Sequence, residues 1–136
     1  MLEESNETFR KNLLFFLLLT FPFTVLSCHV RPTPDQIYGA DYGPHPSDYE
    51  AIIKEYYSSY LFDPYSAVYT FRMPTKAWRS QFSQVQYGWA VCGTINAKNR
   101  FGGYVGAKPF YVMIHYGKVI IQFDDFMAEV ACKQTY

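Results

Sequence analysis

Acidic residues are missing from the middle of this sequence, since no Asp or Glu lies between Pro64 and Phe123. The chain as a whole has a formal net charge of +0 at pH 7, so bulk charge indicates no partner. Either the flanking acidic segments fold back and neutralise the basic residues of this stretch, or the stretch forms a basic face for an anionic polymer or lipid headgroup. Its basic residues are Arg72, Lys76, Arg79, Lys98, Arg100, Lys108 and Lys118.

The short motifs of the common enzyme classes are also missing. The sequence contains no H-E-x-x-H, no G-x-S-x-G and no Walker-type phosphate loop. It has no C-x-x-C, and its three histidines are not spaced as metal ligands. Asp124 and Asp125 would point to opposite faces of a strand, and His115 lies on an alternating apolar segment. We therefore expect no enzymatic activity, cofactor or metal, with an inhibitor or an unrecognised hydrolase as the alternative.

One long apolar run is present, from Leu13 to Leu26. It is shorter than the roughly 20 residues that a helix needs to span a bilayer. Two basic residues precede the run and Ser27 follows it. A basic flank, an apolar core and a small residue before the processing point are typical of a signal peptide, which we expect over residues 1–27.

The run closes with Val25-Leu26-Ser27-Cys28. This tetrapeptide resembles the lipobox of bacterial lipoproteins, in which cleavage falls before a cysteine that then carries lipid. The resemblance implies a mature protein that begins at Cys28 and is anchored by its acyl chains. Because His29 and not Asp follows, it also implies the periplasmic face of the outer membrane. The alternative is an ordinary secretory leader, with Cys28 as a free thiol.

Cysteine is scarce, and the three cysteines of the chain cannot all pair with one another in an oxidising compartment. If Cys28 carries lipid, Cys92 and Cys132 remain to form one disulfide. Closing that loop of about 40 residues would stabilise the fold by on the order of 4 kcal/mol in the chain-entropy model.

The segment after Cys28 is rich in proline and turn-forming residues, which predicts an extended tether over residues 28–46. The domain is then expected over residues 47–136. Ser47 and Glu50 are spaced as a capping box that opens a helix. Apolar residues spaced three and four apart form one face of this helix: Tyr49, Ile52, Ile53, Tyr56, Tyr60 and Leu61.

Beyond Pro64 the apolar residues alternate with a period of two, which predicts strands over residues 66–72, 87–97, 109–115 and 118–123. Tyr116 and Gly117 are expected to form a hairpin turn, and residues 124–132 a short helix. The predicted fold class is α+β: one amphipathic helix packed on a mainly antiparallel sheet of three or four strands, a short C-terminal helix and one disulfide.

The most distinctive pattern is VCG at residues 91–93, followed by NAKN at 96–99, FGGY at 101–104 and PF at 109–110. A DP.SA segment precedes it at residues 63–67. Together these resemble a family of small uncharacterised proteobacterial envelope proteins. The resemblance implies a location in the cell envelope and brings no activity with it.

The loop inside this pattern is rich in glycine and asparagine, with cationic and aromatic side chains interleaved. It is either an elaborate hairpin loop held by its own side chains or a recognition loop. Residues 103–106 spell a G-x-x-G found in nucleic-acid-binding loops, but an exported protein is not expected to bind nucleic acid. The candidate binding residues are Asn96, Lys98, Asn99, Arg100, Phe101, Gly102, Gly103, Tyr104 and Lys108.

We expect from these features a non-catalytic interaction domain with a protein partner in the envelope, as an accessory part of a secretion or envelope assembly. The basic stretch supports the alternative of a binding module for an anionic cell-wall polymer or lipid headgroup.

Overall fold

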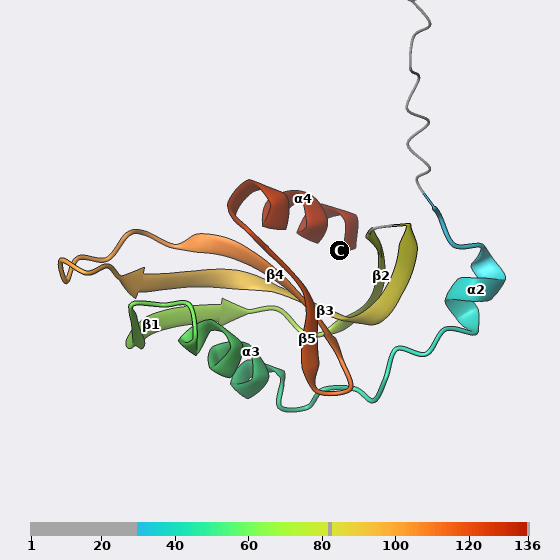
Figure 1. Cartoon of the computed structure of the whole chain (residues 1–136), viewed down its shortest axis with the longest axis horizontal. Helices are drawn as coiled ribbons and strands as arrows, with labels where there is room; N and C mark the ends of the chain where they lie inside the picture. Colours follow the sequence, from blue (N-terminus) through green and yellow to red (C-terminus); the bar gives the residue numbers. More distant parts are fainter. Residues whose placement is uncertain (1–29, 82, 136) are drawn as a thin grey trace, which may run out of the picture.

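The computed structural model describes residues 30–81 and 83–135, and both the expected signal peptide and Cys28 lie outside these ranges. Figure 1 shows the helices of the described residues beside one curved sheet. In chain order the elements are α2 (Pro34–Tyr38), α3 (Tyr49–Ser58), β1 (Asp63–Phe71), β2 (Thr75–Gln81), β3 (Gln84–Lys98), β4 (Lys108–His115), β5 (Lys118–Asp124) and α4 (Asp125–Thr135).

The sheet is antiparallel and is organised around β3, which is 15 residues long. β4 pairs along one edge of β3, and β5 pairs with β4. β1 and β2 share the other edge, since β1 pairs with the end of β3 and β2 pairs with its beginning. The predicted α+β fold is confirmed, with the short β2 as a fifth strand.

Helix α3 packs on one face of the sheet, as the spacing of its apolar residues predicted. Ile53 and Tyr57 are its buried residues. They lie in one core cluster with side chains of the two central strands: Val91, Ile95, Phe110, Val112 and Ile114. Burial of such side chains contributes roughly 1.5–3 kcal/mol each, so this layer is a main source of stability.

Helix α4 covers the opposite face and builds a second core (Figure 1). Ala128 and Ala131 pack there against Tyr111 and Met113. Successive side chains of β3 point to opposite faces of the sheet, so they contribute to both buried layers.

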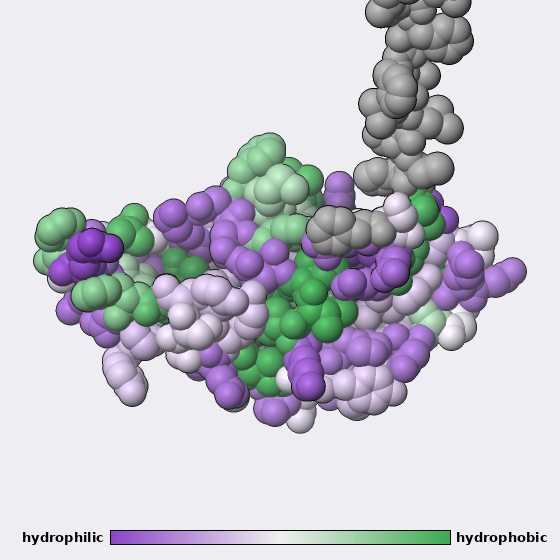
Figure 2. All heavy atoms as spheres, viewed as in Figure 1, coloured by the Kyte–Doolittle hydropathy of each residue, from purple (hydrophilic) through white to green (hydrophobic). Residues whose placement is uncertain are grey.

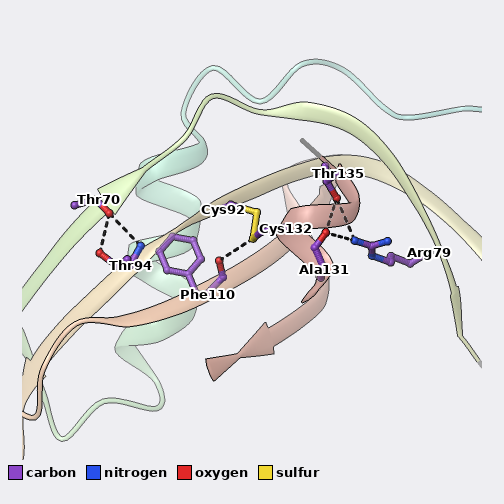
Figure 3. Close-up of a disulfide and its surroundings, with 8 residues drawn as sticks. All are labelled: Thr70, Arg79, Cys92, Thr94, Phe110, Ala131, Cys132 and Thr135. Carbon is purple, nitrogen blue, oxygen red and sulfur yellow. Dashed lines mark hydrogen bonds between the residues drawn. A yellow bond between two sulfur atoms is a disulfide. The ribbon is translucent and has the colours of Figure 1, made fainter. Parts of the chain in front are cut away.

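The expected disulfide is present, and it joins α4 to the centre of the sheet (Figure 3). Cys92 and Cys132 have an S–S distance of 2.04 Å. Beside it, the Arg79 guanidinium donates to the carbonyl oxygen of Ala131 at 2.5 Å and to Oγ1 of Thr135 at 3.1 Å. A cation at the C-terminal end of a helix satisfies its last carbonyls and complements its dipole.

The expected capping box at Ser47 does not form. Asp48 is the N-cap residue of α3, and its side chain makes no capping hydrogen bond. The Glu50 carboxylate pairs instead with Lys54 at 3.3 Å. An i,i+4 ion pair on the exposed face thus replaces the reciprocal cap that the spacing predicted.

The expected tether is wrong for residues 30–46. Helix α2 lies within this segment, and the residues that follow α2 pack on the domain. Tyr42 is buried, the indole Nε1 of Trp89 donates to the carbonyl oxygen of Gly43 at 3.0 Å, and Tyr116 donates to the Asp41 carboxylate at 3.1 Å. Large aromatic surface outweighed the extended tendency of the prolines, so the chain already packs on the sheet from about Asp41 onward.

None of the helices in the described part of the chain has the length and apolar character to cross a bilayer.

Candidate interaction surface

Asn99 shapes the connection between β3 and β4. Its Oδ1 accepts hydrogen bonds from the backbone N–H groups of Phe101 at 2.9 Å and Gly103 at 3.2 Å. The backbone N–H of Asn99 also donates to the carbonyl oxygen of Gly103 at 2.9 Å. Asn99 therefore serves the predicted role of holding the loop through side-chain to backbone bonds.

A second asparagine closes the base of the loop. The Oδ1 of Asn96 accepts from the backbone N–H of Gly106 at 3.1 Å. Gly106 has φ +96° and Gly102 has φ +79°, a region that favours glycine. Asn96, Asn99, Gly102 and Gly106 thus have structural roles in the loop.

The two parts of the sequence pattern meet at Ser66. Its hydroxyl donates to the carbonyl oxygen of Asp63 at 2.8 Å and accepts from the backbone N–H of Lys98 at 3.0 Å. Its carbonyl oxygen accepts from the Tyr104 hydroxyl at 3.2 Å. The segment at residues 63–67 therefore holds the base of the loop.

The VCG and PF segments lie side by side in the sheet, where Gly93 is paired with Phe110. A Cβ atom at Gly93 would lie 2.0 Å from the carbonyl oxygen of Thr70 and 2.6 Å from Cζ of Phe110. Only glycine lets β1 and the Phe110 ring approach this closely. Figure 3 shows Phe110 beside the Cys92–Cys132 disulfide.

Exposed aromatic side chains gather at this end of the molecule. Phe101 is 90% exposed at the tip of the loop, and Tyr65 is 100% exposed near the start of β1. Figure 2 shows apolar and hydrophilic side chains adjoining at the left-hand tip, where Figure 1 places the loop. We call this region the aromatic end and define it by Tyr60, Phe62, Tyr65, Phe101 and Tyr104.

Three of these residues had no expected role at the surface. The spacing of the helix placed Tyr60 on its buried face, but the side chain is mostly exposed because α3 ends two residues earlier. Phe62 and Tyr65 flank the Asp63-Pro64 helix stop, and this position at a turn is the signal that could have marked them as exposed.

The basic residues of the acid-free stretch have different kinds of neighbours in the structure. Lys98 lies over the Tyr104 ring at 5.5 Å, and Lys76 lies over the Tyr42 ring at 5.1 Å. Lys108 pairs with Asp125 at 3.2 Å. Arg79 contacts the end of α4. The Lys108–Asp125 pair agrees with the expectation that a flanking acidic segment folds back on the basic stretch, whereas aromatic rings contact Lys98 and Lys76. Arg100 is exposed at the loop tip.

The adjacent carboxylates Asp124 and Asp125 serve different partners. The Tyr57 hydroxyl donates to Oδ1 of Asp124 at 2.7 Å, whereas Asp125 begins α4 and pairs with Lys108. Burial raises the pKa of the Tyr57 hydroxyl far above its ordinary value, and the Asp124 hydrogen bond raises this pKa further. His115 packs edge-on against Tyr116, with ring centroids 4.8 Å apart.

Within residues 30–81 and 83–135, no group of three His, Cys, Asp or Glu side chains could hold a metal ion. No protein-family model matches the chain, and the searches of curated proteins and solved structures also found no match.

Proposed function

We propose that this chain is a lipid-anchored lipoprotein of the bacterial outer membrane, facing the periplasm, whose domain binds another protein through the aromatic end. The protein is a non-catalytic accessory component of an envelope or secretion assembly. The observation that carries the proposal is the exposure of five aromatic side chains at one end of the domain. Such rings supply large contact area at low conformational cost, which makes them common anchors of protein interfaces.

The arrangement of the termini supports the same function. In Figure 1 the chain enters the domain at α2, at the opposite end of the molecule from the β3–β4 loop. A lipid on Cys28 would hold the α2 side near the membrane and leave the aromatic end accessible to a partner.

A second candidate is a binding module for an anionic polymer or headgroup. It is favoured by one observation, that Lys98, Arg100 and Lys108 all lie at or beside the loop. Because Lys108 is paired with Asp125 and Lys98 lies over the Tyr104 ring, two of these three cations already have partners with which an anionic ligand would compete. A protein partner therefore remains the first proposal.

Photocrosslinking in intact cells tests the partner. With a benzoylphenylalanine in place of Phe101, we expect a discrete protein adduct on gels after illumination. The matched control carries the same group at Tyr38, which is 91% exposed at the other end of the domain. Equal adducts from both positions, no protein adduct from position 101, or an adduct to a polysaccharide or lipid would contradict the proposal.

A further inference from the structure

The outer edge of β1 is not paired with any other described strand, since β1 ends the strand order of the sheet. From Tyr65 to Phe71 this strand has no charged residue and no proline. Natural proteins usually protect an edge strand with charge, proline, a β-bulge or a covering segment. β1 carries such features at its start, where Asp63, Pro64 and a register shift lie. Here the register shifts between Asp63 and Val68, and the strand beyond the shift pairs regularly with β3. The edge therefore offers backbone donors and acceptors for another strand.

Two hollows flank this edge, one on each face of the sheet. The hollow on the α3 side has a volume of about 240 Å³ and is lined by Lys54, Ser58, Pro64, Tyr65, Ala67 and Tyr69. The hollow on the α4 side has a volume of about 630 Å³, and its lining includes Thr70, Arg72, Thr94, Glu129, Cys132 and Lys133. Each hollow lies between β1 and a helix that covers only part of the sheet.

We propose that β1 binds an extended segment of a partner protein as an added strand. Alternate side chains of a strand point to opposite faces, so the segment would place one set of side chains in each hollow. Backbone hydrogen bonds to β1 would supply affinity, and the two hollows would supply specificity. The proposal rests on the proposed function in that the partner is a protein, and it specifies how that protein is held.

The small side chain of Ala67 indicates the size of the partner side chain that would lie opposite it. Tyr65 and Tyr69 line the α3-side hollow on both sides of Ala67. A large apolar side chain opposite Ala67 would fill this space. If β1 paired with a second copy of itself about Ala67, Ala67 would face Ala67 and leave the α3-side hollow of each copy unfilled. The shape therefore favours a different polypeptide over a second copy of this chain.

The charge of the hollows adds a second requirement. Arg72 and Lys133 line the α4-side hollow, against the acid Glu129. Lys54 of the α3-side hollow is already paired with Glu50 at 3.3 Å, so the excess of basic charge beside β1 lies on the α4 side. Complementary charge steers binding and fixes the register of the two partners. We therefore expect acidic residues in the bound segment, on either side of its large apolar residue.

Peptide selection on the full-length protein, solubilised in detergent, tests this inference. The probe is a phage-displayed library of random peptides of about twelve residues, long enough to follow the 9 residues of β1. We expect enriched peptides with a large apolar residue flanked by acids. Their synthetic forms should bind Ala67→Phe about tenfold or more weakly than wild type, because the new ring fills the hollow. Ala51→Phe, the same enlargement at an exposed position of α3, should leave binding unchanged.

Amide hydrogen exchange of the wild-type protein, measured with and without peptide, locates the peptide-binding site without any substitution. Bound peptide should slow amide exchange in β1 more than in the β3–β4 loop. No enrichment, peptides that bind Ala67→Phe as tightly as wild type, or protection elsewhere would overturn the inference. If amide exchange in β1 slowed at higher protein concentration without peptide, two copies of this chain would pair through β1, and the proposed binding of a different polypeptide would be wrong. Because Phe101 lies outside β1, these outcomes are separate from the crosslinking test of the proposed function.

Discussion

Gly93→Ala is expected to destabilise the protein by about 3 kcal/mol or more, or to prevent folding. The added Cβ would lie 2.0 Å from the carbonyl oxygen of Thr70, which is backbone and cannot rotate away. It would also meet the Phe110 ring, which packs against Tyr57 and Phe71. Relief of the clash requires β1 and β3 to separate, so the core under α3 opens. The measurement is the free energy of unfolding from urea titration followed by circular dichroism.

Gly103→Ala is the matched control, because it adds the same methyl group to the same sequence pattern. The nearest atom to a Cβ at Gly103 is Oδ1 of Asn99, at 3.9 Å. This variant should unfold within about 0.5 kcal/mol of wild type, as surface substitutions usually do. Equal unfolding free energies for Gly93→Ala and wild type would contradict the close approach of β1 to β3.

Loss of the disulfide is expected to have a comparable effect. The variant with both Cys92→Ala and Cys132→Ala no longer closes a loop with a sequence separation of 40, so the unfolded chain gains entropy. The chain-entropy model gives a loss of about 4 kcal/mol in the free energy of unfolding. Helix α4 should remain attached at lower stability, because Ala128 and Ala131 are buried and Arg79 still bonds to its C-terminal end.

A reductant separates the covalent effect from the effect of the substitutions. Wild type should lose stability in a phosphine reductant and approach the double variant, whereas the double variant should not respond. Urea midpoints with and without reductant give the comparison. A wild-type midpoint that does not move although free thiols appear would contradict a stabilising role for the bond.

The sequence predicted the helices and strands in which core residues recur at a regular spacing. The three- and four-residue spacing that includes Ile52, Ile53 and Tyr56 predicted α3, although it missed the buried Tyr57. The alternation along β3 predicted the central strand. Tyr116 and Gly117 were predicted as a hairpin turn, and the structure gives them φ values of 46° and 72°. That turn chemistry is local, which is why it can be predicted without the rest of the fold.

The missed features depend on distant contacts. The sequence of β2 contains two cations and little alternation, and its pairing with β3 forms it. Tyr42 is buried because Tyr87 and Lys76 lie against it, and both are far away in the sequence. Proline content alone therefore predicted an extended tether for residues 30–46, although part of this segment packs on the sheet.

The predicted loop does connect β3 and β4, and its residues divide into two groups. Asn96 and Asn99 hold the backbone of the loop, as the structural interpretation required. Phe101 is exposed, as the recognition interpretation required. Tyr65 was missed because the exposure of an aromatic residue depends on where the neighbouring elements end.

Metabolic labelling with a clickable fatty acid tests most directly whether a lipid on Cys28 anchors the domain. Wild type and the variant with both Cys92→Ala and Cys132→Ala should be labelled and should fractionate with membranes, since acyl chains provide the attachment. Cys28→Ser should lose both the label and the membrane fractionation. Equal labelling of Cys28→Ser and wild type would contradict the anchor.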